Sequence, residues 1–486
     1  MSDSLASLRA ALNPKGGLQR IPLTLESYQH PSAPLSSKTL LNLHAEQQPA
    51  DARTSVALVS APGLTTYTTI GTGPHKDTNL EIPGVLYTVS GTHVYRYLFP
   101  GLTDLGLVGT PSMDERGDDT LSVTIAVGPT AMVVCVPPNC YTCTHSGALN
   151  LITGTFPGAN SVAYLNGYFI FTTTGSDTRF FISYLLDPTL FNALSFAYSD
   201  GLPGALRRVV THRGEAWMIG ETACEVWYIS GDADFPFRRR EGATSYRGTA
   251  NARSIAMGDS SIWMVSPEGM VFRADGYRFM RVSTHAVEAA IATQGIGTLS
   301  DACFLEVRGH AFYAVTIGTR TLVYDAATKL WAERSSAADG NGRWRARTAI
   351  TNTDTPLIGD NTSGKMFTPT YNDDKEDGTA MLHRVVSPPI WGQERRVPMH
   401  RFAVEMEVGD TAPGTMTLDW SDDGGWNWRT PARTLNTGAA GARRQRVYTT
   451  RLGAFRQRMM RLTCTGKVTI YGMEHDSAPM LSLEDA

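Results

Sequence analysis

Short apolar or alternating runs, bounded by Gly, Asp, Asn or Pro, make up most of the chain. Such runs are typical of β-strands. Helical periodicity is limited to residues 4–12 and 284–292; in the second segment Val287 and Ile291 are four residues apart and Ser283 can cap the helix. The pattern therefore predicts an all-β protein with one or two short helices.

The apolar runs recur in pairs, in which a turn opens a first run and a second run follows shortly afterwards. The first runs begin at Val85, Met132, Tyr168, Ala216, Ile262, Ala311 and Leu357, with spacings of 47, 36, 48, 46, 49 and 46 residues. A period of about 40–50 residues with a hairpin in each unit is typical of β-propeller blades. We predict an N-terminal arm over residues 1–42 and a seven-bladed propeller over 43–370. An open solenoid is the alternative, and the paired antiparallel runs favour the propeller.

The pattern changes after Tyr371. Residues 372–378 form a charged, glycine-ended segment, and strict alternation of apolar and polar positions follows at 402–408, 416–420 and 468–471. This pattern predicts a separate C-terminal β-sandwich domain over residues 371–486.

Composition narrows the functional classes. The 486 residues are 42% hydrophobic, which supports a sizeable core, and 43 basic against 46 acidic residues give a net charge of -3. This charge excludes a globally basic nucleic-acid-binding protein. No apolar stretch is long enough to span a bilayer and no secretory signal precedes the first strands, so we expect synthesis in the cytoplasm and no stable membrane insertion.

The six cysteines are too few and too scattered for a disulfide framework in so long a chain. Cys140 and Cys143 have C-x-x-C spacing near His145, but no second pair follows. Ordinary strand thiols are the favoured interpretation, and a structural zinc site is the alternative. We predict no metal site.

One local motif stands out at residues 421–428, which read S-D-D-G-G-W-N-W. It fits S-x-D-x-G-x-x-W and resembles the Asp-box hairpin of sialidases and related propellers. Ser421 and Asp423 can accept backbone N–H groups, Gly425 can adopt positive φ, and Trp428 can cover the hairpin. The functional alternative is a sialidase-like glycosidase, but a single box outside the propeller favours a structural turn.

Residues 429–461 contain nine arginines and no acidic residue. Arginine suits contacts with carboxylates and phosphates because its guanidinium is a planar fork. A solvated strand face, a protein interface with acidic partners and direct DNA contact all remain open. The candidate interface residues are Arg443, Arg444, Arg446, Arg451, Arg456, Arg458 and Arg461.

Signatures of catalysis are missing. The sequence contains no G-x-S-x-G, H-E-x-x-H or G-x-x-x-x-G-K-[ST] motif, and its 11 histidines are dispersed. We predict a protein that is not an enzyme, with no catalytic residues and no cofactor.

Several segments, in this order, resemble the packaged-DNA stabilisation proteins of short-tailed bacteriophages. They are Asn42–Glu46, Pro62–Leu64, Gly71–Pro74, Gly84–Gly91, Glu225–Tyr228, Arg281–Glu288, Tyr324–Trp331 and Trp420–Gly425. The similarity extends from about Gln19 to Asp476. At Asn42–Glu46 the chain departs from the family's usual N-L-Y-P-E-like run, since His44 and Ala45 replace its aromatic residue and proline.

The resemblance implies a structural protein of the virion tail. Such proteins form a homo-hexameric nozzle below the portal and adaptor rings, retain the packaged DNA and conduct it during ejection, and contact tail fibres or tailspikes. A near-neutral wall suits a conduit, because a strongly basic wall would hold DNA phosphates. The alternative is a propeller glycan hydrolase or lectin, which a monomeric mass and glycosidase activity would distinguish from a six-fold ring.

Overall fold

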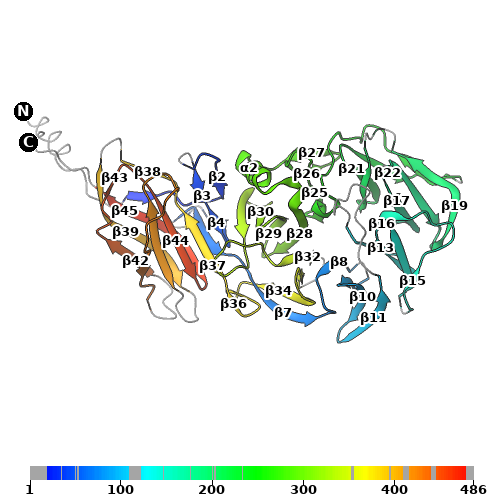
Figure 1. Cartoon of the computed structure of the whole chain (residues 1–486), viewed down its shortest axis with the longest axis horizontal. Coiled ribbons are helices and arrows are strands. Elements are labelled where there is room, and N and C mark those ends of the chain that lie inside the picture. Colours follow the sequence, from blue (N-terminus) through cyan, green and yellow to red (C-terminus); the bar gives the residue numbers. More distant parts are fainter. Residues whose placement is uncertain are drawn as a thin grey trace, which may run out of the picture. The chain divides into compact units, whose positions relative to one another are not determined.

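The computed structural model describes residues 19–33, 36–49, 51, 54–80, 82–108, 122–145, 147–175, 177–199, 201, 204–232, 234–351, 355–392, 396–408, 415–438 and 445–477. Within these residues the chain is all-β (Figure 1), with one α-helix, α2 (His285–Gln294), and two 3-10 turns, η1 (Ala252–Ser254) and η2 (Ile296–Thr298). The helix predicted at 284–292 is confirmed, although Thr284 rather than Ser283 caps it, accepting from the Val287 N–H at 3.4 Å. The helix predicted at 4–12 lies outside the described residues. No described helix is both long enough and apolar enough to cross a membrane.

The chain forms two compact units. One, here called the propeller unit, contains residues 65–329 and 343–369, and the other, the sandwich unit, contains residues 1–64, 330–342 and 370–486. Both were predicted as fold types, a β-propeller followed by a β-sandwich.

Five blades of the propeller unit are four-stranded antiparallel sheets made of consecutive strands. Their strands are β8 (His75–Asn79), β9 (Leu86–Ser90), β10 (His93–Leu98) and β11 (Gly101–Leu107); β12 (Thr124–Val127), β13 (Ala131–Val136), β14 (Asn139–Thr144) and β15 (Asn150–Leu151); β16 (Ala159–Leu165), β17 (Tyr168–Thr173), β18 (Arg179–Tyr184) and β19 (Asp187–Tyr198); β20 (Leu206–His212), β21 (Glu215–Gly220), β22 (Cys224–Ile229) and β23 (Phe237–Arg239); and β24 (Ala256–Gly258), β25 (Ser261–Val265), β26 (Val271–Asp275) and β27 (Arg278–Arg281).

A sixth blade is also made of consecutive strands and begins with β28 (Leu299–Val307), β29 (His310–Ile317) and β30 (Arg320–Asp325). The last sheet is composite: β32 (Ala346–Ile350), β33 (Leu357–Asp360) and β34 (Lys365–Thr370) are completed by β7 (Gly63–Thr69) from the start of the unit. Immediately after β7, the Ile70 N–H donates to the Gly364 carbonyl at 2.6 Å. Six blades therefore consist of consecutive strands, and the predicted number of seven is reached with the composite sheet that closes the ring.

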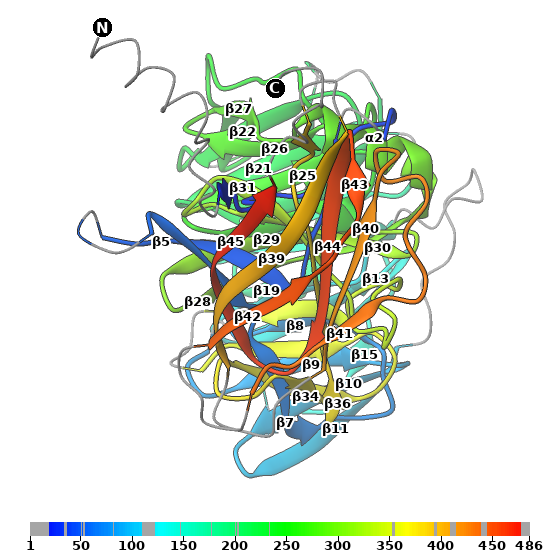
Figure 2. The same cartoon turned by 90° about the vertical axis from the view of Figure 1, so that its left-hand side faces the viewer.

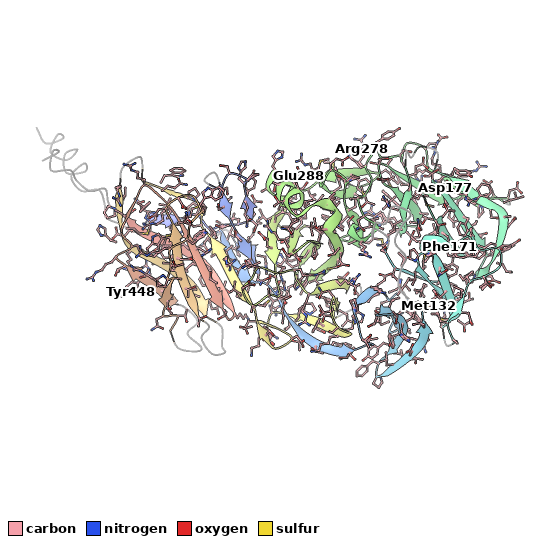
Figure 3. The ribbon with its side chains drawn as sticks, in the orientation of Figure 1. Met132, Phe171, Asp177, Arg278, Glu288 and Tyr448 are labelled. Atoms are coloured by element: carbon pink, nitrogen blue, oxygen red, sulfur yellow. The ribbon has the colours of Figure 1, made fainter. Side chains whose placement is uncertain are left out.

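Six of the seven predicted run starts fall on the second strand of a sheet, from β13 to β33, and the remaining one, Val85, directly precedes the second strand β9. The reason is burial on both faces, since neighbouring blades cover the middle of each sheet. In β13, which includes Met132 (Figure 3), every residue is buried, and the same is true of β21 and β25. Hairpins enter these strands with positive φ, as at Asn166 and Gly167, whose φ angles are 45° and 95°.

Aromatic side chains fill the spaces between blades. Phe171 of β17 (Figure 3) stacks on Phe181 of the same blade with ring centroids 5.2 Å apart, and both pack in one core with Val133 of the neighbouring blade. Trp263 of β25 stacks on Tyr313 of β29, in the next blade, at 5.5 Å. The Tyr313 hydroxyl donates to the Ser254 carbonyl at 2.7 Å, so its polar end is satisfied inside the core. Blade packing thus accounts for most of the tryptophans and phenylalanines in the strand runs.

The sandwich unit has two sheets, whose strands β39, β42, β44 and β45 are prominent in Figure 2. The first sheet orders β42 (Gln445–Thr450), β39 (Val397–Val408), β45 (Val468–Ser477), β6 (Val56–Ser60) and β5 (Leu43–Gln47), with β1 (Gln19–Ile21) on β45 and β43 (Ala454–Phe455) on β39. The second orders β31 (Leu330–Arg334), β4 (Leu40–Leu41), β37 (Leu382–Val386), β44 (Gln457–Thr465), β40 (Met416–Ser421) and β41 (Arg433–Leu435), with β38 (Ile390–Trp391) on β44. Two small ladders, β2 (Tyr28–Gln29) with β3 (Ser37–Lys38) and β35 (Lys375–Glu376) with β36 (Thr379–Ala380), complete the unit.

The division of the chain differs from the predicted one at residue 42, because residues 43–64 belong to the sandwich unit, whereas the later change of unit falls at Thr370. Strands β5 and β6 were assigned to the propeller, but β6 pairs with β45 in the register Thr469↔Val59 and Ile470↔Leu58. Leu43 and Leu58 are buried in the same core as Phe402 of β39. Because this pairing joins segments about 400 residues apart in sequence, no local pattern could reveal it.

Candidate interaction surfaces

The Asp-box-like motif forms the turn that follows β40. The Ser421 hydroxyl donates to Asp423 Oδ1 at 2.6 Å and accepts from the Gly425 N–H at 2.8 Å. The Asp423 carboxylate accepts from the Asn427 N–H at 2.9 Å, and Gly425 has a φ of 99°. A Cβ at Gly425 would lie 2.6 Å from Ser37 Oγ. The Ser421 and Asp423 oxygens are therefore used to hold the turn.

The fourth residue of the motif, Trp428, is half-buried, and the guanidinium of Arg461 lies 4.1 Å from its ring centre. The ring that is buried in the core of the sandwich is Trp420, at 4% exposed. The sequence predicted that Trp428 covers the hairpin. In the structure this cover is shared between Trp428 and Arg461.

Arg458, one of the candidate interface residues, is 1% exposed. Its Nε and Nη2 donate to the two Asp422 carboxylate oxygens at 2.6 and 2.8 Å, and Nη1 donates to the Leu452 carbonyl at 2.8 Å. The guanidinium also lies 4.7 Å from the ring centre of Phe455. Arg458 therefore serves the sandwich core rather than a partner surface.

Two further arginines of this set have intramolecular partners. Arg461 Nε donates to Asp419 Oδ1 at 2.9 Å, and Arg446 of β42 pairs with Glu474 of β45. Arg451 and Arg456 have exposed side chains. Arg443 and Arg444 lie outside the described residues. Of the predicted set, the structure thus presents Arg451 and Arg456 most openly.

We expect Asp422→Ala to lower the free energy of unfolding by about 2–3 kcal/mol, because it leaves the buried Arg458 charge without its counter-ion. This value lies below the ~3–5 kcal/mol that is usual for a fully buried pair, because the Asp422 side chain is 45% exposed and water can replace part of the interaction. Denaturant titration of the full chain measures the change. The double variant with Arg458→Met is expected to recover most of the loss, and equal stability of Asp422→Ala and wild type would contradict the assignment.

The cysteine pair does not have the geometry of a zinc site. Cys140 and Cys143 are three residues apart on β14, so they face opposite sides of the sheet and join different cores. The His145 ring instead lies 3.0 Å from the Tyr87 hydroxyl. All six cysteines are buried and none of them forms a disulfide.

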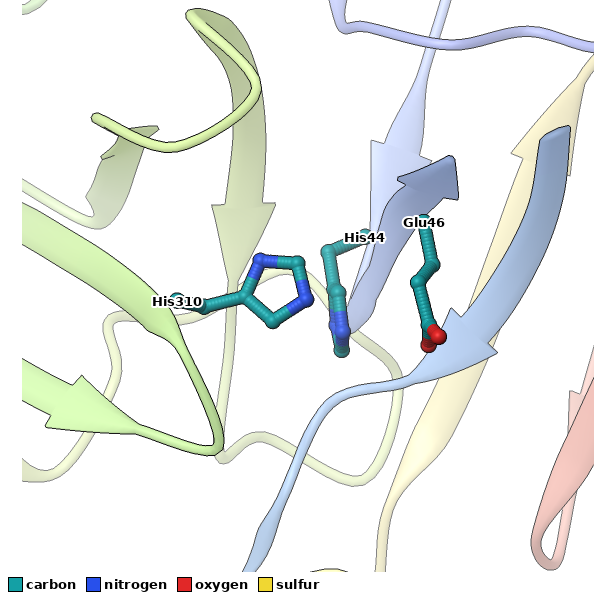
Figure 4. A group of neighbouring side chains, drawn as sticks. All are labelled: His44, Glu46 and His310. Atoms are coloured by element: carbon teal, nitrogen blue, oxygen red, sulfur yellow. The ribbon is translucent and has the colours of Figure 1, made fainter. Parts of the chain in front are cut away.

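Figure 4 shows three side chains with ligand chemistry. His44 and Glu46 project from β5, and the Tyr371 hydroxyl lies 3.4 Å from His44 Nε2 within the sandwich unit. His310, the first residue of β29, belongs to the propeller unit, where its Nδ1 lies 2.8 Å from Asp325. Because the residues belong to separate units, we assign no metal site to them.

The centre of the propeller unit contains a cavity of about 580 Å³. Its lining among the described residues comes from six of the seven sheets and includes the charged residues Lys76, Asp77, Arg208, Arg253, Asp301, Arg343 and Arg347. Asp301 is shared, since Arg343 Nη2 lies 3.1 Å from one of its oxygens and Arg347 Nε 2.9 Å from the other.

Enclosure alters the protonation of the charged groups in this cavity. Burial raises the pKa of Asp77 to about 6, while Arg208 and the hydrogen bond from the Ile125 N–H, 2.8 Å long, act in the opposite direction. Burial likewise lowers the pKa of Arg208, and the Asp77 charge opposes that shift. The two groups thus stabilise each other's charged form in a poorly solvated space.

Sequence reasoning missed the cavity residues. They lie on or beside the first strands of the blades, such as β8, β20 and β28, which carry polar side chains toward the ring centre and so lack the apolar runs that mark the second strands. A weak signal was available, since Arg207-Arg208 and Arg343, Arg345 and Arg347 precede two of the recognised runs.

A second feature is the exposed apolar edge of the blade formed by β16–β19. Strand β19 is its outermost strand (Figure 1) and is twelve residues long. Leu190 is 54% exposed and Leu194 80% exposed. The register with β18 shifts between Phe181 and Tyr184, so residues 192–195 of β19 lie outside the ladder. A similar exposure occurs on β10 and β11, where Phe99 between the strands is 72% exposed.

A propeller of this kind followed by a sandwich defines a structural class, and the family comparison specifies it. Residues 19–369 match the family described as "Bacteriophage P22 Gp10, beta-propeller", and residues 383–476 match "Bacteriophage P22 Gp10, beta-sandwich". The chain belongs to the bacteriophage P22 Gp10 family of phage stabilisation proteins, which confirms the predicted family, and it is a bacteriophage virion protein. The family is one of phage structural stabilisation proteins.

No curated protein sequence matches the chain. Among solved structures, the computationally designed Ika8 protein is similar over 63% of this chain and 99% of its own, at 8% identity and a TM-score of 0.38. Hsv2 of Kluyveromyces lactis covers 61% of this chain and 97% of its own, at 10% identity and a TM-score of 0.35. PorZ of Porphyromonas gingivalis covers 78% of this chain and 48% of its own, at 10% identity and a TM-score of 0.35. These scores are too low to carry an argument.

Proposed function

We propose that this protein is a nozzle subunit of the virion tail, which assembles with copies of itself into a homo-hexameric ring below the portal and adaptor, retains the packaged DNA and conducts it during ejection. The observation that supports this proposal best is the exposed apolar edge of the β16–β19 blade. A protein that functions alone has no use for such an edge, whereas a subunit of a ring does.

Edge strands of monomeric proteins are normally protected by charges, by prolines or by being short. Strand β19 is long, its one charged residue is Asp187 at the start, and its one proline is Pro188 beside it. The rest of the strand is apolar or neutral, with Leu190 and Leu194 turned to solvent. Covering these side chains would remove apolar surface from water at about 25 cal/mol per Å².

A second copy of this chain is the occupant that we propose. Each subunit of a ring presents two different surfaces to its neighbours, and this unit has two exposed apolar edges on different blades, at Leu190–Leu194 and around Phe99. Because the same contact is repeated at every interface of a ring, modest pairwise contacts are sufficient for assembly. The family resemblance supports the hexameric number and the remaining partners, which are the adaptor or portal proteins, a tail fibre or tailspike, and double-stranded DNA in the channel.

Arg451 and Arg456 remain candidates for contacts with acidic surfaces of a neighbour or of the adaptor, together with Arg443 and Arg444. Arg446, Arg458 and Arg461 are poor candidates, because their guanidinium groups already contact carboxylates within the sandwich unit. Exposed ion pairs contribute only about 0–1 kcal/mol each. We therefore expect the apolar edges to dominate assembly and the arginines to contribute to its specificity.

We expect the double variant Leu190→Asp/Leu194→Asp to fold but to fail in assembly, because charges on the edge oppose burial of the strand. The test is complementation of a phage that lacks this chain, with nuclease-resistant DNA in purified particles and tail images as readouts. Wild type is expected to give filled particles with a six-fold tail ring. The double variant is expected to give particles that lose their DNA.

Met280→Asp is the matched control, since Met280 is a similarly exposed apolar residue on the outermost strand of another blade, β27. It should assemble as wild type does. Filled, infectious particles carrying the double variant would overturn the proposed edge contact. A wild-type chain that is monomeric in the particle, with activity on glycans, would favour the hydrolase or lectin alternative.

A further inference from the structure

Two of the six cysteines, Cys135 and Cys140, are direct partners across the β13–β14 hairpin. The register places Cys135 opposite Cys140, and the next pair, beside the turn, is Val136 with Asn139. The other cysteines face different residues across their sheets: Met132 for Cys143, Ile219 for Cys224, Ala314 for Cys303, and Met416 and His383 for Cys464. Within the described strands, Cys135 and Cys140 are therefore the one pair of cysteines that share a register position.

The backbone geometry brings these two side chains close together. The Cys140 carbonyl accepts from the Ile152 N–H at 2.9 Å, on the side of β14 that faces β15 rather than β13. Because the N–H and C=O of a strand residue point to the same side, Cys135 and Cys140 form a non-hydrogen-bonded pair, whose Cα atoms are about 4.5 Å apart. This separation lies within the range of about 4.4–6.8 Å that a disulfide requires.

The two thiols contact each other in a closed environment. Both side chains are fully buried and pack in one core. Burial, the hydrogen bond with the Cys135 thiol and the charge of that thiol when it ionises raise the pKa of Cys140 well above its usual range. Cys135 Sγ also donates to the Ala159 carbonyl at 3.4 Å. An S–H group is a weak donor, so the loss of these hydrogen bonds on oxidation costs little.

The pair lies beside an exposed turn, which gives an oxidant a route to it. Pro138 and Asn139 are exposed, and exposed turns belong to the segments that open locally at low cost. A protonated, buried thiol reacts slowly, so we expect oxidation through such openings rather than in the closed blade. Burial then protects the product, because a reductant needs the same opening.

We propose that Cys135 and Cys140 form a redox-controlled cross-link site, which is reduced during synthesis and joined by a disulfide when the virion meets an oxidising environment. With a small disulfide such as oxidised glutathione, one cysteine attacks a sulfur of the oxidant and releases one thiol. The second cysteine then displaces the other thiol and closes the Sγ–Sγ bond. The two cysteines lose two protons and two electrons, and the oxidant takes up both to become two thiols.

The bond would tie the two central strands of the blade together beside their turn. Disulfides persist in oxidising environments, which include virion surfaces, and are rare in the cytosol. The proposal uses the assignment to a virion protein family and does not depend on the nozzle role or on the number of subunits.

Counting of free thiols tests this site. The purified full chain is incubated with oxidised glutathione until its thiol content is constant, and is then denatured, alkylated with a maleimide and weighed by mass spectrometry. We expect six free thiols before incubation and two fewer after it, with one peptide that links Cys135 to Cys140. Cys135→Ala and Cys140→Ala should form no intramolecular disulfide. The oxidised wild type should melt at a higher temperature than the reduced form, because a cross-link restricts the unfolded chain.

Cys143→Ala is the matched control, since Cys143 lies on the same strand but faces Met132 in a different core. This variant should form the disulfide as the wild type does. A wild type that keeps all six thiols would overturn the proposal, and so would an intramolecular disulfide that persists in Cys135→Ala. If the single variants do not fold, the linked peptide of the wild type still decides, because any pairing other than Cys135 with Cys140 contradicts the site.

Discussion

A fragment that ends at Tyr371 is expected to aggregate, although the sequence pattern places a complete propeller before this residue. Strand β6 would lose its partner β45 and β4 would lose β37, because these partners follow residue 371. The fragment would expose Leu40, Leu43 and Leu58, which are buried in the sandwich core. Unpaired strands with apolar faces are aggregation sites.

The matched fragment is 63–369, which keeps β7 and therefore the sheet that closes the ring. We expect it to remain soluble and to melt cooperatively in calorimetry or circular dichroism, in contrast to 1–371. A soluble 1–371 fragment with a cooperative transition would show that β4–β6 do not need their partners in the sandwich unit.

Glu225→Ala is expected to destabilise the propeller unit by about 3–5 kcal/mol. Glu225 is fully buried, and its carboxylate accepts from the Ser199 hydroxyl at 2.6 Å, the Gly201 N–H at 2.9 Å and Trp227 Nε1 at 3.2 Å. Arg239 supplies the compensating charge, with Nη1 3.2 Å from the carboxylate. Removing the acceptor leaves these donors and the arginine without their partner.

Chemical denaturation of the full chain measures this effect, and Glu268→Ala is the control, since Glu268 is an exposed turn residue in the next blade. Glu225→Gln should cost less than Glu225→Ala, because the amide oxygen still accepts some of the hydrogen bonds. If Glu225→Ala were no more destabilising than Glu268→Ala, the hydrogen bonds of the Glu225 carboxylate would not stabilise its blade.

Glu225 also explains one of the segments that carry the family resemblance. The segment Glu225–Tyr228 lies in β22, where the acid, the tryptophan and their neighbours form one hydrogen-bonded group. The similarity of this segment to the family therefore reflects the packing of a blade. The Asp-box-like motif is comparable, since its oxygens hold a turn rather than a ligand.

The sequence alone predicted the family, the all-β class, the repeating blade and the sandwich. These features depend on local periodicity: β13 is apolar throughout and β21 is apolar after Glu215 because blades cover both faces, and Phe402–Val408 alternates because one face of its sheet meets the core. Turns such as Asn166-Gly167 were also visible, because positive φ restricts the residues that can occupy them. Each of these signals is contained within a few neighbouring residues.

Only the tertiary structure decided which distant segments share a sheet and which charges meet. The pairing of β6 with β45, the burial of Arg458 against Asp422 and the convergence of Arg208, Asp301 and Arg347 on one cavity join residues that are far apart along the chain. The sequence does not distinguish an exposed arginine such as Arg456 from a buried one such as Arg458, which is 1% exposed. Its role depends on the partners that the fold brings within about 3 Å, and long-range geometry rather than residue type determines these partners.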